Sequence, residues 1–278
     1  MDRAGTSPSS YALGHSAQEL ERLSRQAEVF APFTRQLLKQ AGIRPGMRIL
    51  DVGCGAGDVT FLAADLVGPT GKVVGTDHAT AAVEWARARN QGRRAKNVEF
   101  LEGDPTRIEF DGQFDAVVGR FVLMYYPDPI AAIRKLTRHV RSDGLIIFQE
   151  FDMDNARTYP PAQTLDRTLA WMRRAFDATG AHTQLGLELF RMFLAAGLTA
   201  PLLRVDAIIA GGLQFPCDIL VALMRSLLPV MEKLEIASAS EVELPTLAER
   251  MRNEVVACRG VIRSPAIVGA WSRKPARL

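Results

Sequence analysis

Residues 49–58 read Ile-Leu-Asp-Val-Gly-Cys-Gly-Ala-Gly-Asp. The apolar run predicts a short buried strand, and the alternate glycines Gly53, Gly55 and Gly57 predict a sharp turn before a helix. Glycine lets the backbone turn tightly and lets a ligand approach the main chain. Amide groups at the start of the helix can then bind a polar or anionic group. This stretch therefore predicts a ligand-binding turn at the edge of a sheet.

The composition is that of one large globular domain, or of a domain that carries a cap. The chain has 278 residues, of which 47% are apolar, and these values exclude disordered, collagen-like and disulfide-stapled proteins. The formal charge of +3 comes without a long basic run and does not imply a nucleic-acid partner. Cys54, Cys217 and Cys258 are too widely spaced for a disulfide framework or a metal site. With no signal peptide or membrane span in the pattern, we expect a cytoplasmic protein.

Short apolar strands alternate with amphipathic helices through the first half of the chain. This rhythm is typical of a parallel, doubly wound sheet. The expected strands are 47–52, 72–76, 98–101, 114–118 and 145–151, and the expected helices are 58–67, 79–90 and 129–141.

The rhythm changes after Asp154. Two helices (162–179 and 185–196) precede two further strands (202–209 and 261–271), and some 45 residues of helical periodicity lie between those strands. That connection is too long for a hairpin and predicts an inserted helical cap over the carboxyl edge of the sheet. The expected organisation is an N-terminal helical lid (1–41), a cofactor-binding core (42–155), a cap helix (156–182), core (183–214), the inserted cap (215–259) and a final core strand (260–278).

Two acidic residues follow the next two strands. Asp77 ends the second strand, 20 residues after Gly57, where it can accept hydrogen bonds from the hydroxyls of a ribose. Asp104 ends the third strand, where it can accept from an adenine amino group. The dinucleotide pattern would need glycine at position 58, and the carboxylate of Asp58 would repel a pyrophosphate.

The glycine pattern with Asp51 before it resembles motif I of the class I S-adenosylmethionine-dependent methyltransferases, in their small-molecule branch. Asp77 and Gly103-Asp104 fall where that family has its ribose and adenine acids, and 114–118 resembles its fourth-strand motif. The resemblance covers about residues 15–155 closely. It implies a Rossmann-like, mostly parallel, seven-stranded sheet with an antiparallel last strand at 263–271, together with the helical cap.

The resemblance also implies a set of cofactor-binding residues. Each has a structural alternative, since Asp51 can bond the glycine loop, Asp77 can cap a helix and Asp104 can stabilise a turn. Arg120 is a candidate for the methionine carboxylate, His78 for packing on the nucleoside and Tyr11 for closing over the cofactor. The expected set is Asp51, Gly53, Gly55, Gly57, Asp77, His78, Gly103, Asp104, Pro105, Gly119, Arg120 and Tyr11.

Transfer of an activated methyl group needs alignment and exclusion of water more than acid–base chemistry. Candidate catalytic residues are His15, His182, Asp152 and Tyr125, each of which can also be structural. Gly119-Arg120 stands where metal-dependent O-methyltransferases carry an aspartate, so no metal site is expected.

The resulting hypothesis is methyl transfer from S-adenosyl-L-methionine to a small, partly apolar molecule, with S-adenosyl-L-homocysteine as product. The large apolar cap favours secondary-metabolite biosynthesis. One alternative is a non-catalytic cofactor-binding partner subunit of another methyltransferase. A nicotinamide-dependent oxidoreductase is disfavoured by Asp58. No nucleic-acid or membrane partner is expected, a homodimer stays open, and the accepting atom is not predicted.

Overall fold

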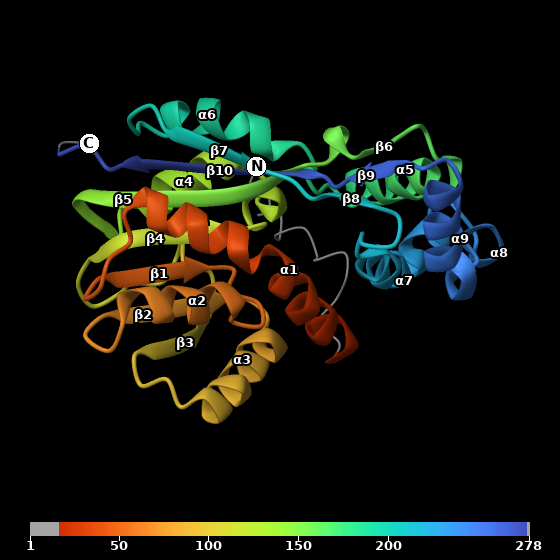
Figure 1. The fold of residues 1–278 in the computed structure, drawn as a ribbon. Coiled ribbons are helices and arrows are strands. Elements are labelled where there is room, and N and C mark those ends of the chain that lie inside the picture. Colours follow the sequence, from red (N-terminus) through yellow and green to blue (C-terminus); the bar gives the residue numbers. More distant parts are fainter. Residues whose placement is uncertain (1–16, 277–278) are drawn as a thin grey trace, which may run out of the picture.

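The computed structural model describes residues 17–276, and its centre is a seven-stranded sheet with the order β3-β2-β1-β4-β5-β10-β7 (Figure 1). All neighbouring strands are parallel except at β10, which runs antiparallel to β5 and to β7. The predicted fold class is confirmed. The strands are β1 (Arg48–Val52), β2 (Lys72–Asp77), β3 (Val98–Glu102), β4 (Phe114–Arg120), β5 (Val140–Asp152), β7 (Leu202–Asp206) and β10 (Ala266–Arg273).

Helices bury both faces of this sheet, which explains why its central strands are apolar throughout rather than alternating. Side chains alternate along a strand, so Ile49 of β1 packs beneath α1 (Ala17–Ala41) and α2 (Asp58–Val67), whereas Leu50 faces the opposite side. On that side lie α4 (Pro129–Thr137) and α6 (Leu185–Ala195). The remaining core helix, α3 (Thr80–Arg93), packs against β2 and β3.

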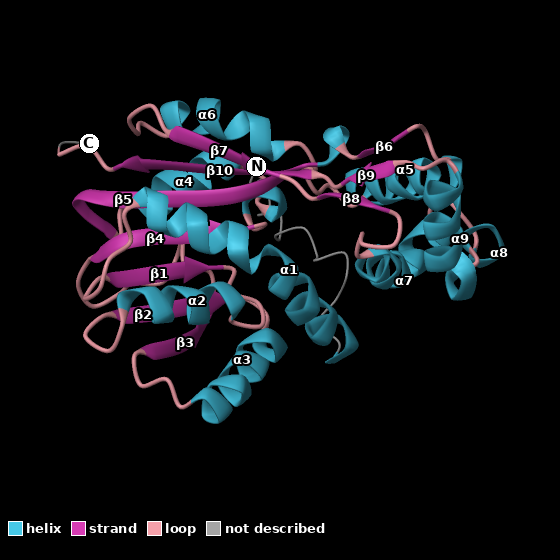
Figure 2. Cartoon of the chain, in the orientation of Figure 1, coloured by secondary structure: helices cyan, strands magenta, loops and turns pink. Residues whose placement is uncertain are grey.

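The cap lies beyond one end of the sheet, as Figure 2 shows. It contains α5 (Gln163–Ala178), α7 (Cys217–Lys233), α8 (Ala239–Val242) and α9 (Leu244–Ala257). Apolar side chains such as Trp171, Met224 and Met251 join these helices into one buried cluster. Within residues 17–276, no helix combines the length and the apolar character that a membrane span requires.

The cap also holds a three-stranded antiparallel sheet that the sequence pattern does not predict. Its order is β6 (Arg157–Tyr159), β9 (Val261–Arg263) and β8 (Ile209–Gly211). The single strands predicted at 202–209 and 261–271 are therefore wrong, because each is divided between the two sheets. At the crossing, Ser264 N donates to Ile208 O at 2.9 Å, and Pro265 has no amide hydrogen with which to continue a ladder.

A further correction concerns residues 142–144, where the sequence predicts a turn before a strand. The structure includes them in β5, which pairs with β4 from Val140 onward. The register shifts between Phe114 and Ala116, and Asp143 has a φ of 60°. A bulge of this kind absorbs turn-forming residues without ending the strand.

Candidate active site

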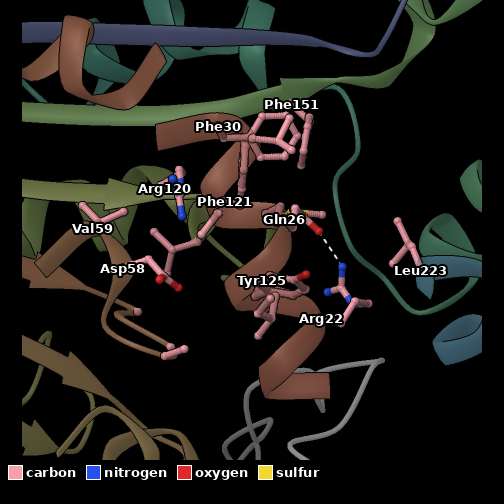
Figure 3. A pocket seen from close by; sticks show the side chains of 18 of the residues that line it. Arg22, Gln26, Phe30, Asp58, Val59, Arg120, Phe121, Tyr125, Phe151 and Leu223 are labelled. Atoms are coloured by element: carbon pink, nitrogen blue, oxygen red, sulfur yellow. Dashed lines mark hydrogen bonds between the residues drawn. The ribbon is translucent and has the colours of Figure 1, made fainter. Parts of the chain in front are cut away.

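A cavity of about 300 Å³ lies between the carboxyl ends of the strands, the N-terminal half of α1 and the cap. The order of the strands sets the order of its lining. Asp104 follows β3, Asp77 ends β2, the glycine loop follows β1, Arg120 ends β4, and Phe151 lies near the end of β5. In Figure 3, Asp58 and Arg120 lie on the side opposite Leu223 of the cap helix α7.

The three glycines of the loop after β1 all have positive φ, and their surroundings differ. A Cβ on Gly53 would lie 2.4 Å from Val122 Cγ2, and one on Gly57 would lie 2.9 Å from Phe100 Cζ. A Cβ on Gly55 would meet nothing within 4 Å, although Gly55 lines the cavity. Packing therefore requires glycine at the first and third positions, and the middle position leaves the main chain open to a ligand.

Asp77 joins the glycine loop to the start of α3. Its Oδ2 accepts from Gly55 N at 2.9 Å and its Oδ1 accepts from Ala79 N at 3.0 Å. It is nearly buried and lines the cavity. Each carboxylate oxygen accepts more than one hydrogen bond, so these two amides leave capacity for ribose hydroxyls.

Asp104 stabilises a turn and lines the cavity as well. Its two oxygens accept from Thr106 N and Thr106 Oγ1, both at 2.8 Å, and Gly103 and Pro105 line the cavity beside it. His78 also lines the cavity, with its side chain mostly exposed and Nδ1 3.6 Å from Asp77 Oδ1.

Asp51 lies behind the glycine loop and does not line the cavity. It is 1% exposed and accepts from Thr60 Oγ1 of α2 at 2.6 Å. Burial raises the pKa of its carboxyl to about 7. Gly57 and Gly119 also lie outside the lining, so these three residues shape the loop from behind.

Arg120 is half-buried at the end of β4 and lines the cavity. Its Nη1 donates to Thr34 Oγ1 of α1 at 3.2 Å, and Thr34 donates on to Gln149 Oε1 at 2.7 Å. Burial lowers the pKa of the guanidinium, while the Asp58 carboxylate opposes that shift. Asp58 itself forms an ion pair with Arg89 at 2.9 Å. A guanidinium held in this way suits a ligand carboxylate.

The structure brings only part of the predicted catalytic set to the cavity. Tyr125 lines it. Asp152 is buried outside the lining, where its carboxylate accepts from Asn155 Nδ2, and His182 is exposed and also outside the lining. Tyr11 and His15 lie outside the described residues.

The sequence pattern did not predict the place of Phe30 or the role of Glu150. Phe30 of α1 lines the cavity beside Phe121 and Phe151. Glu150, which is fully buried in β5, accepts from Val122 N at 3.0 Å and from Leu123 N at 2.8 Å and so holds the loop after β4. Burial raises the pKa of Glu150 to about 8. The available signal was a glutamate just after the apolar run 145–148 of a central strand, where buried charged residues are rare.

A family model described as a Methyltransferase domain matches residues 43–192, more than half of the chain. A demethylmenaquinone methyltransferase of Lactococcus lactis is 35% identical over 111 residues, which cover 40% of this chain and 44% of the relative. A nocamycin O-methyltransferase of Saccharothrix syringae is 40% identical over 120 residues, 43% of each chain. The matched part thus spans less than half the length of these curated relatives.

Solved structures share the fold. The YcgJ protein of Bacillus subtilis matches with a TM-score of 0.59 and 20% identity, covering 87% of this chain and 99% of that chain. Haemonchus contortus phosphoethanolamine N-methyltransferase 2, solved with S-adenosyl-L-methionine, matches with a TM-score of 0.54 and 15% identity, covering 88% of this chain and 52% of that chain.

Proposed function

This chain belongs to the class I S-adenosylmethionine-dependent methyltransferases, and we propose that it transfers a methyl group from that cofactor to a small, partly apolar molecule. The observation that carries the proposal is that an open glycine position, two strand-end carboxylates and an arginine meet an apolar cap in one cavity. The printed names of the demethylmenaquinone and nocamycin relatives support a small-molecule acceptor and, for the second, a secondary-metabolite context.

The residues present fit the cofactor. The open space at Gly55 admits a ligand to the main chain, and Asp77 and Asp104 offer acceptors to ribose hydroxyls and to an adenine amino group. Arg120, at the next strand end, offers a guanidinium to the methionine carboxylate. Because β3, β2, β1 and β4 are neighbours in that order, the cofactor would extend along the sheet edge from its adenine at β3 to its carboxylate at β4.

When bound, S-adenosylmethionine supplies a methyl carbon that its sulfonium sulfur has already activated. The protein then has to orient the acceptor and exclude water. The cap helices α5 and α7 perform the second task, because their apolar side chains Met172 and Leu220 line the cavity. Tyr125, which lines the same cavity, is the candidate for orienting the acceptor atom.

Calorimetric titration with S-adenosylhomocysteine and with NADH tests the cofactor assignment. We expect saturable binding of the first and none of the second, because Asp58 in the cavity repels a pyrophosphate. Tight NADH binding without S-adenosylhomocysteine binding would refute the proposal.

Incubation with a labelled methyl donor and cell extract then separates an enzyme from a partner subunit. Label should appear in a small organic product only when the protein is present. A protein that binds the cofactor but never yields labelled product would instead be the non-catalytic partner subunit.

A further inference from the structure

Three phenylalanines form a continuous aromatic wall in the cavity, defined here as Phe30, Phe121 and Phe151. The rings of Phe121 and Phe151 are stacked, with centroids 3.8 Å apart and an interplanar angle of 6°. Phe30 lies edge-on to both, with centroid distances of 5.6 and 5.7 Å. All three rings are half-buried and line the cavity, so part of each ring surface faces it.

The wall adjoins the predicted methyl-donor end. Phe121 follows Arg120 at the end of β4, and Phe151 lies near the end of β5, the next strand of the sheet. The glycine loop follows β1 on the other side of β4. A molecule that contacts the wall therefore lies beneath the cap. It also lies next to the methionine end of the cofactor, which is proposed to contact Arg120.

The backbone at Phe121 is held in a conformation that aromatic residues rarely adopt. Its φ is 56°, in the left-handed region that costs a residue with a Cβ about 1–2 kcal/mol. Phe121 N donates to Gln149 O at 2.8 Å, and buried Glu150 holds the next two amides. Glycine at this position would adopt the same conformation without this cost. Strained residues that their surroundings hold in this way cluster at functional sites.

The cap side of the cavity offers nothing to a charged acceptor. Among the described lining residues, those from α5, from 208–223 and from 264–265 carry no charge. Arg22 of α1 lines the cavity, but its guanidinium forms a buried ion pair with Glu19 at 2.6 Å. A phosphate, carboxylate or ammonium group placed there would lose its water without gaining a partner of opposite charge.

We propose that the methyl acceptor is a neutral molecule with a planar conjugated ring, and that the ring binds against the aromatic wall. The inference rests on the proposed function and deepens it. Aromatic pairs gain about 0.5–1.5 kcal/mol beyond the burial of their area, which distinguishes a conjugated ring from a saturated ring of the same size. Phe121 and Phe151 thereby become specificity-determining residues.

The test compares three probes that share one ring skeleton. These are 2-naphthol, which is planar and neutral, decahydro-2-naphthol, which is saturated, and 2-naphthyl phosphate, which is charged. Each is titrated calorimetrically into the protein, alone and saturated with S-adenosylhomocysteine. We expect 2-naphthol to bind roughly three- to tenfold more tightly than decahydro-2-naphthol. The ratio of its affinity to that of 2-naphthyl phosphate should be larger than this.

Variants locate the binding. Phe121→Leu and Phe151→Leu keep an apolar side chain of similar bulk, and each should weaken 2-naphthol binding roughly threefold or more while leaving decahydro-2-naphthol binding unchanged. Phe190→Leu is the matched control, because Phe190 is 42% exposed on α6 and lies outside the lining. Thermal unfolding and S-adenosylhomocysteine binding of each variant establish that it is folded.

The outcomes distinguish a failure of the aromatic-acceptor inference from a failure of the proposed function. Equal or tighter binding of decahydro-2-naphthol or of the phosphate overturns the inference, as does 2-naphthol binding that neither variant weakens. If S-adenosylhomocysteine binds but 2-naphthol does not, the inference alone fails. If S-adenosylhomocysteine does not bind, the proposed function fails.

Discussion

Replacement of Gly55 by alanine tests the ligand-binding loop most directly. Its φ of 51° makes alanine unfavourable by about 1–2 kcal/mol in stability, but the new methyl group meets no protein atom within 4 Å. The methyl group instead occupies the space that a bound cofactor needs. Forcing an extra methyl group into filled space costs about 1–3 kcal/mol, which corresponds to roughly 5- to 150-fold weaker binding of S-adenosylhomocysteine.

Gly42→Ala separates this effect from backbone strain. Gly42 follows α1, has a φ of 99°, lies outside the cavity lining and likewise has no atom within 4 Å of the position of a Cβ. We expect this variant to lose at least as much stability as Gly55→Ala in thermal unfolding and to bind S-adenosylhomocysteine like the wild type in calorimetry. If Gly55→Ala also binds within twofold of the wild type, Gly55 does not face the cofactor.

Three further variants test the surroundings of the loop. Asp77→Ala should weaken S-adenosylhomocysteine binding by about 1–3 kcal/mol in calorimetry. Asp65→Ala, which alters an exposed ion pair, should leave that affinity unchanged. If the Asp77→Ala variant binds as tightly as the wild type, Asp77 does not belong to the site. Gly53→Ala should destabilise the protein more than Gly55→Ala in chemical denaturation, because its Cβ would lie 2.4 Å from Val122 Cγ2; a second change, Val122→Ala, should recover part of the loss. Glu150→Gln should change the pH dependence of stability, because the folded-state pKa of about 8 lies above the ordinary 4.5 and the folded wild type therefore binds a proton that the unfolded chain releases. Between pH 5 and pH 8 the free energy of unfolding of the wild type should fall by about 3 kcal/mol relative to that of the variant. If the two proteins show the same change in free energy of unfolding over that range, the pKa of Glu150 is not raised.

The core of the fold could be predicted because its signals are local. A buried strand, a glycine turn and a helix occupy consecutive residues at 49–67, and Asp77 and Asp104 follow their strands directly. Parallel strands bring their carboxyl ends to one edge, so the meeting of these carboxylates in one cavity followed from topology alone.

Other features depend on tertiary contacts that no local pattern encodes. Phe30 reads as one more apolar residue of a helix, yet its ring packs edge-on against Phe151 of β5 in the wall of the cavity. His182 and Asp152 are chemically suitable, but neither lines the cavity. The small cap sheet pairs segments that are far apart in sequence, such as 157–159 with 261–263, and short strands of three residues leave little periodicity to detect.

The two segments that pass from the large sheet into the small one have a mechanical consequence. Residues 202–211 and 261–273 each contribute a strand to both sheets, and the bond from Ser264 to Ile208 ties them together where they cross. Two chain crossings joined by a hydrogen bond restrict a swing of the cap away from the core more than a single linker would. We therefore expect the cavity to keep its shape between catalytic cycles. Selection among acceptors then depends on a preformed binding site and not on closure of the cap around each acceptor.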